Sequence, residues 1–195
     1  IVIGGIIHIT NNALRGEADD VVDQIVNDPS LSTLASLILQ NGLVSILKQP
    51  AQYTVFAPSD NAFAAITNTI TNLNSEGINT ILQYHVLPIV KLSYQVRTTL
   101  YVISINNFPL ILGPTTETFY IQAIASRAEA TEEDLRCGNG VVHKIDTVLL
   151  PFDTLTNTIN QDPDLTFLSA TLSATNYGTT LDVISDIYTV FAPTD

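Results

Sequence analysis

The sequence predicts an α+β domain in which helices come first and strands follow. Apolar residues recur at helical spacing between residues 28 and 86, whereas β-rich runs separated by turn signals occupy residues 100–149. Because the two kinds of element are segregated along the chain, an α+β arrangement is favoured over a βαβ architecture. A long internal repeat also predicts that the chain contains parts of more than one such domain.

The repeat is carried by the hexapeptide Tyr-Thr-Val-Phe-Ala-Pro. It occurs at Tyr53–Pro58 and again at Tyr188–Pro193, a spacing of 135 residues (188 − 53). Two further pairs keep nearly this phase, since Gly5–His8 returns as Gly140–His143 and Asp28–Leu31 returns as Asp162–Leu165. Solenoid repeats are only about 20–50 residues long, so a period of this length indicates a domain.

These landmarks predict a tandem array of which the chain contains one whole member. We expect residues 1–17 to be the closing strand of a preceding domain, 18–151 a complete domain, and 152–195 the opening segment of a following one. The second hexapeptide is expected to be a core strand, as the first is. A parent polypeptide of at least three repeats is therefore expected.

The first expected element is a helix over residues 28–42. Asp28 is a suitable N-cap, Pro29 fits the first turn, and Gly42 can close the helix in a left-handed conformation. Apolar residues lie on one face at helical spacing, and the second copy keeps both the cap and the stripe (Leu31, Leu34, Ile38; Asp162, Pro163, Leu165, Leu168, Leu172).

A short strand at Tyr53–Ala57 is predicted next, because its residues are mostly β-branched or aromatic and Pro58 follows. Asp60 is expected to cap a short helix that turns Phe63 and Ile66 inward. A further helix is expected from about Gly77 to Val86, with Pro88 ending it. Its apolar face carries several residues at helical spacing (Ile78, Ile81, Leu82, His85).

The second half of the domain is predicted to be β-structure. Four β-rich runs are separated by Asn-Asn, Gly-Pro and Gly-Asn-Gly turn signals (Leu100–Ile105, Phe108–Leu112, Thr118–Ile124, Val141–Leu149). The acidic segment Ala128–Asp134 is expected to be a connection before the last strand.

Composition narrows the possible functions. The chain has 7 basic and 19 acidic residues, so nucleic acid and anionic membranes are poor partners. Cys137 is the only cysteine, and no spacing of Cys and His suits a metal site. No nucleophile elbow, phosphate loop or dinucleotide fingerprint occurs, so neither an enzyme nor a cofactor is expected. No apolar run reaches the roughly 18 residues that a membrane span needs.

Three signatures in order on one domain carry a resemblance to a known family. They are Tyr53–Phe63, then Leu82-Gln-Tyr-His-Val-Leu-Pro88, then Asn139–Pro151. Together they closely resemble the fasciclin domain family over residues 18–151. The resemblance implies helices packed on a sandwich or wedge of mostly antiparallel strands, with a structural signature in the matching positions (Thr54, Val55, Phe56, Ala57, Pro58, Asp60, Gly140, His143, Asp146).

The resemblance also suggests two partner-binding segments. An adhesion motif implicated in integrin binding matches Glu132, Glu133, Asp134 and Leu135, although Arg136 stands where the family has an apolar residue. A solvated acidic loop is the alternative. The second segment is built around the Tyr84–His85 pair, with aliphatic neighbours. For His85 and His143 the residues alone favour buried, hydrogen-bonded core positions over ligand or pH-switch roles.

The function implied by the resemblance is adhesion. We expect an extracellular, secreted or cell-surface matrix protein whose repeats contact neighbouring domains, matrix proteins, glycans or receptors, and which can build a filament. The alternative is a carrier of an apolar, carotenoid-type ligand, since some algal fasciclin-like proteins bind carotenoids and the β-half is rich in Ile, Leu and Tyr.

Overall fold

The structure is a computed structural model that describes residues 19–71, 73–151, 155–175, 177–181 and 189–195. The expected closing strand within residues 1–17 lies outside the described residues. No described helix is both long and apolar enough to cross a membrane. The described elements form an α+β domain over residues 19–151, as the sequence predicts, followed by helices within residues 155–175 and 177–181.

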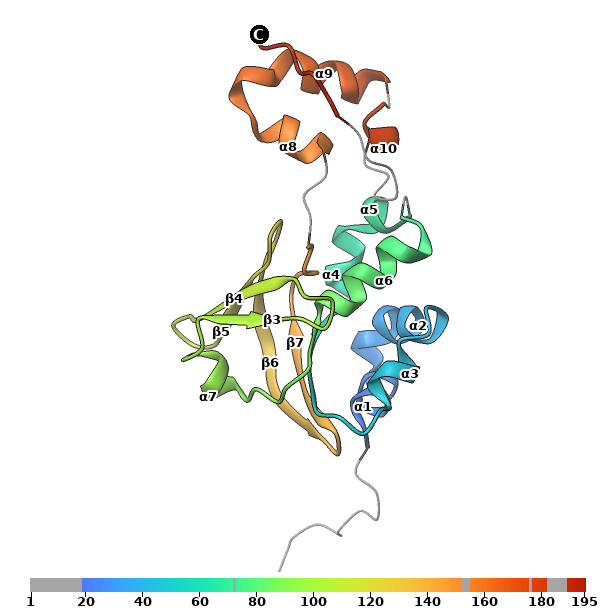
Figure 1. Ribbon diagram of the computed structural model, residues 1–195, viewed down its shortest axis with the longest axis vertical. Coiled ribbons are helices and arrows are strands. Elements are labelled where there is room, and N and C mark those ends of the chain that lie inside the picture. Colours follow the sequence, from blue (N-terminus) through green and yellow to red (C-terminus); the bar gives the residue numbers. More distant parts are fainter. Residues whose placement is uncertain (1–18, 72, 152–154, 176, 182–188) are drawn as a thin grey trace, which may run out of the picture.

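Short helices make up the first half of the domain, and all of them except α7 lie to one side of the sheet (Figure 1). Helix α7 lies on the other side of the strands (Figure 1). The helices are linked by caps and turns rather than by long loops. Their bounds are as follows: α1 Val21–Val26, the 3-10 turn η1 Pro29–Leu31, α2 Ser32–Gln40, α3 Val44–Leu47, α4 Asp60–Ala65, α5 Thr67–Thr71, α6 Ser75–Tyr84 and α7 Ser93–Val96.

The helix expected over residues 28–42 is confirmed, with a tighter first turn. Asp28 accepts a hydrogen bond from the Ser30 amide at 2.9 Å and so caps η1, which leads directly into α2. Gly42 has φ +73°, which is the left-handed conformation that ends a helix. Leu31, Leu34 and Ile38 are all buried against the sheet side of the helical layer.

Asp60 caps a different helix from the one expected. Ser59, not Asp60, is the N-cap of α4, because its hydroxyl accepts the Ala62 amide. The Asp60 carboxylate instead reaches α2, where it accepts the Thr33 amide and the Ser32 hydroxyl, each at 2.8 Å. The expectation was wrong because a carboxylate at the first helical position can point away from its own helix towards orphan amides nearby.

A seven-stranded sheet forms the other half, in the order β2-β1-β7-β6-β5-β4-β3. Neighbouring strands are antiparallel except for β1 and β7, which are parallel, with Val55 opposite Val142. The bounds are β1 Tyr53–Pro58, β2 Val86–Leu87, β3 Tyr101–Ile103, β4 Pro109–Pro114, β5 Phe119–Gln122, β6 Arg127–Cys137 and β7 Gly140–Ile145.

Strand β1 separates two hydrophobic cores, and every one of its residues is buried. Tyr53, Val55 and Ala57 face the helices, whereas Phe56 faces the inside of the curved sheet with Phe119. Side chains alternate between the two faces of a strand, so a strand covered on both faces reads as a continuous apolar run. This explains why the hexapeptide shows no alternation of polar residues.

Two boundaries differ from the sequence prediction. The acidic segment expected as a connection lies within β6, because Ala128 and Ala130 alternate inward while Glu129 and Thr131 face solvent. Its many carboxylates suggested a loop, but only every second side chain of a strand has to be apolar. The helix expected to reach Val86 ends at Tyr84, and Val86 instead pairs with β1.

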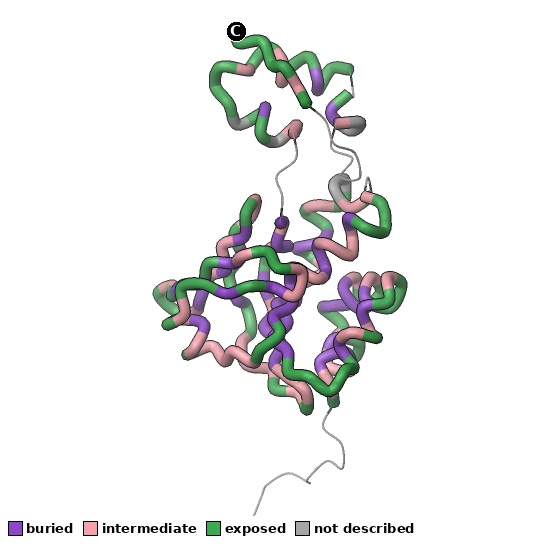
Figure 2. The backbone as a smooth tube through the Cα atoms, viewed as in Figure 1, coloured by how far each residue is buried: buried purple, intermediate pink, exposed green. Residues whose placement is uncertain are grey.

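The segment after the domain contains α8 Leu155–Gln161, the 3-10 turn η2 Pro163–Leu165, α9 Thr166–Thr175 and α10 Tyr177–Leu181. Buried positions gather between helices and sheet in the domain, whereas α8–α10 is largely exposed or half-buried (Figure 2). Residues 189–193, expected to belong to a core strand, form no strand, and Phe191 is 92% exposed. A strand needs a hydrogen-bonded neighbour, and no described strand lies beside this one.

Candidate functional site

The acidic adhesion-type segment lies on β6, where the strand is irregular. The register with β7 shifts between Ala130 and Glu132 and again between Glu132 and Leu135. Asp134 has φ +60°, the left-handed region that non-glycine residues seldom adopt. Such a bulge bends a strand and re-aims its side chains. The three neighbouring carboxylates therefore point towards different parts of the domain.

Each of these carboxylates contacts a partner within the domain. Glu132 pairs with Lys144 on β7 at 2.8 Å, and Glu133 pairs with the Arg97 guanidinium at 2.8 Å. Asp134 accepts both the backbone amide and the hydroxyl of Ser93, at 2.8 and 2.7 Å. Ser93 is the first residue of α7, so Asp134 supplies the side-chain cap that the N-cap residue Leu92 does not provide. The segment thus ties β6 to β7 and α7.

Lys144 joins the acidic segment to the helical layer. Its ammonium also lies 2.5 Å from the Asp28 carboxylate at the start of η1. Burial opposes the charge on both groups, but their interactions together outweigh it. Asp28 and Glu132 raise the pKa of Lys144, and Lys144 and Ser30 lower the pKa of Asp28. Glu132 is half exposed on the other side of the same ammonium, so it is the one carboxylate of the three with a large solvent-facing surface.

His143 lies under the bulge and is fully buried. Its Nδ1 accepts the Asp134 amide at 3.1 Å, and its Nε2 donates to the Lys91 carbonyl at 2.8 Å, which fixes a neutral tautomer. The ring stacks on Phe56 and meets Phe119 edge-on. Burial lowers the pKa of His143, although the Lys91 carbonyl and the Asp134 carboxylate oppose the shift.

The Tyr84–His85 pair is also buried, at 0% and 1% exposure. The Tyr84 hydroxyl donates to the Pro109 carbonyl at 2.7 Å, and burial raises its pKa. His85 donates from Nδ1 to the Ile81 carbonyl and accepts the Leu149 amide at Nε2. Burial lowers the pKa of His85 to about 4. A partner cannot touch these two side chains in this fold, so they act by joining α6 to the sheet.

The remaining signature residues hold the parallel β1–β7 pair. A Cβ at Gly140 would lie 2.1 Å from the Tyr53 carbonyl oxygen, so only glycine fits there. The Thr54 hydroxyl donates to the Ile89 carbonyl and accepts the Lys91 amide. Beyond β7, the Asp146 carboxylate accepts the Glu129 amide of β6 at 2.8 Å. Val55, Phe56, Ala57 and Pro58 are buried core residues of β1.

Three residues that contribute to this arrangement carried little signal in the sequence. Arg97 and Ser93 bind the acidic segment from about 40 residues away along the chain. Asn139, noted as a turn residue and as the start of the third family signature, accepts the Val21 amide and donates to the Leu47 carbonyl. It thus joins two helices to the β6–β7 turn. Hydrogen-bond partners this far apart along the chain can be identified only once the fold is known.

No group of three His, Cys, Asp or Glu side chains in the described part of the chain could hold a metal ion. Burial, together with Asp20, Asp19 and Asp23, raises the pKa of the Cys137 thiol to about 11, so the nucleophilic thiolate is scarce at neutral pH. A small cavity between α2, α4 and α6 has a volume of about 10 Å³, which is room for one water molecule at most.

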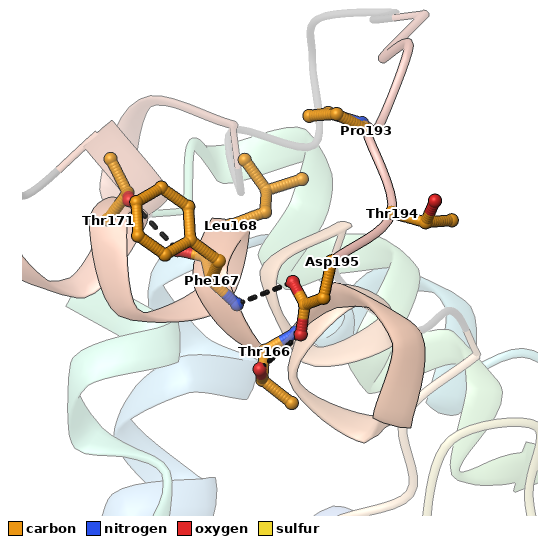
Figure 3. Close-up of a pocket in the computed structure, with 7 residues that line it drawn as sticks. All are labelled: Thr166, Phe167, Leu168, Thr171, Pro193, Thr194 and Asp195. Carbon is orange, nitrogen blue, oxygen red and sulfur yellow. Dashed lines mark hydrogen bonds between the residues drawn. The ribbon is translucent and has the colours of Figure 1, made fainter.

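A larger hollow lies on the segment after the domain, beside α9 (Figure 3). Its volume is about 710 Å³, and apolar side chains of Phe167, Leu168 and Pro193 line it. Asp195 closes one side, where it accepts the Phe167 amide at 2.9 Å and the Thr166 amide at 3.0 Å. These hydrogen bonds hold the last residues of the chain against the start of α9.

Helices packed on a mixed sheet, with the polar signature residues hydrogen-bonded inside the fold, define the α+β architecture of this domain. The sequence model of the Fasciclin domain family matches residues 29–151. The chain therefore belongs to the fasciclin domain family.

Known proteins support this assignment. An uncharacterized protein of Synechocystis sp., sll1735, is 33% identical over 134 residues, which are 67% of this chain and 97% of that protein. Human periostin is 25% identical over 77% of this chain, but the match spans only 18% of periostin. The solved FAS1 domain pair from the insect cell adhesion molecule Fasciclin I is 22% identical with a TM-score of 0.56, covering 85% of this chain and 60% of that one.

Proposed function

We propose that this chain is part of an extracellular adhesion or matrix protein in which fasciclin domains follow one another and act through their surfaces. The family assignment, together with an insect cell adhesion molecule of the same fold, supports an adhesion role. The polar side chains of the domain stabilise its own architecture, as expected of a rigid module that presents surfaces. Contacts with neighbouring domains, matrix proteins, glycans or receptors would then perform the function.

The observation that carries the tandem arrangement is a repeated cap. Asp60 binds the Thr33 amide at the start of α2, and Asp195 binds the Phe167 amide at the start of α9. The acids are 135 residues apart (195 − 60) and the amides 134 (167 − 33). Asp28 and Asp162 likewise cap η1 and η2. Two segments that repeat both caps at a spacing of 134 or 135 residues support a further fasciclin domain that begins near residue 152.

Mass spectrometry of the intact parent polypeptide tests the tandem arrangement. We expect a mass of at least three repeats, well above the 21.1 kDa of these 195 residues. A mature mass near 21 kDa would refute the array. Negative-stain microscopy of native material tests the finer proposal of a filament, which dispersed single chains at high concentration would exclude.

A bead assay tests the adhesion role directly. Beads coated with the chain are expected to aggregate or to bind matrix-coated surfaces, while beads coated with heat-unfolded chain do neither. Binding that persists after unfolding would contradict a role for the folded surface. Within β6, Glu132→Gln is the informative substitution, because Glu132 is half exposed and its partner Lys144 keeps Asp28 as a second partner. Glu133 and Asp134, in contrast, hold Arg97 and Ser93 in place. Loss of binding by a folded Glu132→Gln variant would assign the contact to this acidic segment.

Carriage of an apolar ligand is the second candidate function. The hollow beside α9 favours it, since 710 Å³ lies within the range of about 300–1,000 Å³ for small-molecule sites. The corresponding face of α2 is covered instead by Phe63 and Ile81 of the same domain, so the hollow equally fits the next helices of a second domain. A visible absorption spectrum of natively purified protein is the test, and a colourless preparation would exclude a carotenoid.

A further inference from the structure

Strand β3 leaves one of its edges unpaired. It is the last strand of the sheet, next to β4 alone. The Leu112 amide donates to the Leu100 carbonyl and the Ser104 amide to the Phe108 carbonyl, so residues 100 and 104 point their backbone groups at β4. Backbone direction alternates along a strand, so those of Tyr101 and Ile103 point outward. No residue in the described part of the chain bonds to these outward groups.

The other end of the sheet is engaged. Strand β2 is the opposite edge, and its Val86 carbonyl accepts the Ile105 amide at 2.9 Å. The His85 carbonyl next to it accepts the Phe56 amide of β1. Ile105 lies two residues beyond the end of β3, on the same outward side as Tyr101 and Ile103, so β2 covers that side of the chain there. The backbone groups of Tyr101 and Ile103 are the outward groups of β3 that remain for an incoming strand.

The side chains beside this edge are apolar and exposed. Tyr101, Ile103 and Ile111 lie on one face, since Tyr101 is opposite Ile111, and they are 56%, 47% and 43% exposed. Their neighbours Val102 and Leu110 point into the sheet core. We call Tyr101, Ile103 and Ile111 together the β3 face.

The β3 face also lies in an uncharged part of an acidic chain. No charged residue occurs between Arg97 and Glu117, although the chain carries a net charge of −12. Edge strands are usually protected from other strands by charged side chains, by proline or by a cover. Here no charge is present on β3 or β4, so this edge is the place where two equally acidic molecules can meet without placing like charges in contact.

We propose that the β3 edge binds the β3 edge of a second copy of this chain, in antiparallel pairing about a twofold axis at Val102. Tyr101 then lies opposite Ile103 of the second copy, and each such pair exchanges two backbone hydrogen bonds. The aromatic and β-branched side chains pack across the junction, as cross-strand pairs in sheets do. The pairing is self-complementary, as a twofold interface requires.

This pairing rests on the proposed adhesion role for its biological meaning. It identifies one partner of the domain as a second copy of the same chain. Specific stable interfaces bury about 1,200–2,000 Å² in total, more than two three-residue strands supply, so a single contact is weak. Repeats displayed along an array can strengthen a weak contact by avidity.

Sedimentation velocity of the 195-residue chain tests the pairing, over concentrations from on the order of 10 µM to 1 mM, where weak complexes dissociate. We expect a concentration-dependent dimer that salt strengthens, because salt screens the repulsion between acidic copies. Ile103→Lys is expected to raise the dissociation constant at least tenfold. The matched control Leu39→Lys adds the same charge at an exposed aliphatic residue on α2 and is expected to leave it unchanged.

Mixing two variants of opposite charge distinguishes pairing in this register from nonspecific association. Tyr101→Lys and Ile103→Glu, each folded by circular dichroism, are expected to associate poorly alone and to recover a dimer when mixed, because the new charges lie opposite each other. A monomer at every concentration, equal association of wild type and Ile103→Lys, or an equal loss in Leu39→Lys would each overturn the proposal. A monomeric chain that still aggregates coated beads would reject only the second copy as partner, not the adhesion role.

Discussion

Helices α2 and α9 begin in the same way and differ in what covers them. Each follows a 3-10 turn capped by an aspartate, and each receives a second aspartate on its first amides. The core-facing Leu34 of α2 is 2% exposed, whereas Leu168 at the matching position of α9 remains half-buried. The helix and its cap are therefore encoded locally, while burial depends on the sheet.

Covering a helix should contribute more to its free energy of unfolding than capping it does. Fully burying a leucine side chain contributes about 1.5–3 kcal/mol, whereas a helix cap contributes about 1 kcal/mol. Most of the difference in stability between the two regions should therefore come from packing against β1 and β7, and little from the helices themselves. Paired substitutions at matching or analogous positions test this view.

The largest expected effect is at the parallel β1–β7 pair. Gly140→Ala places a Cβ 2.1 Å from the Tyr53 carbonyl and should unfold the domain or destabilise it by more than about 4 kcal/mol, a size reserved for severe core defects. Gly178→Ala, in α10, meets side-chain atoms of Thr156 at 3.1 Å rather than backbone and should change stability by less than about 1 kcal/mol. Urea unfolding followed by circular dichroism measures both, and equal effects would contradict the comparison.

Leucine truncation tests packing on the two helices directly. Leu34→Ala should destabilise the domain by about 2–5 kcal/mol, because it leaves a cavity in a covered core. Leu168→Ala should cost less than about 1 kcal/mol, because its site is already open to solvent beside the hollow. Hydrogen exchange read by mass spectrometry assigns each loss to its region. A large global loss from Leu168→Ala would show that α9 is covered in solution.

Lowering the pH should destabilise the domain more than the segment after it. Both described histidines lie in the domain, and residues 155–195 contain none. The pKa of His85 is lowered to about 4 by burial, against about 6.5 when unfolded. The unfolded state then binds the proton first, so this contribution is present above pH 6.5 and is lost as pH falls towards 4. We expect the domain to lose about 2 kcal/mol between pH 7 and 5.

Substituting the histidine tests the origin of this loss. His85→Gln keeps a donor and an acceptor for Ile81 and Leu149 without a titrating ring, so it should flatten much of the pH dependence in that window. His143, whose pKa is also lowered by burial, should account for the remainder. An unchanged pH profile in His85→Gln would assign the acid sensitivity to other groups.

The sequence predicted elements whose signals are local. The cap and glycine around α2, the four β-rich runs and the order of helices before strands all follow from neighbouring residues. The acidic strand β6 was missed, since its composition resembles a loop and its alternation is visible only at Ala128 and Ala130. A bulge such as that at Asp134 leaves no clear pattern in one sequence.

The candidate site was less predictable for the same reason. Glu133, Asp134 and Tyr84 were proposed from their match to family motifs, but their surroundings come from distant parts of the chain. Arg97 and Ser93 determine how far the carboxylates reach solvent, and the sheet determines that Tyr84 is buried. Exposure is a tertiary property, so a motif alone does not distinguish a binding surface from an internal contact.

The smallest expected effect lies at the caps, where the two regions are most alike. Asp60→Ala removes the acceptor of the Thr33 amide and should destabilise the domain by about 1 kcal/mol, with the protection of the first turn of α2 reduced. The pKa of Asp60 is lowered by its hydrogen bonds from Thr33 and Ser32, which outweigh burial, so the charged form makes the cap. Asp195→Ala should lower exchange protection at the Thr166 and Phe167 amides without moving the global unfolding transition. If Asp195→Ala shifted the global transition as far as Asp60→Ala does, the α9 segment would be part of the same cooperative unit, and the contrast between a covered and an uncovered helix would fail.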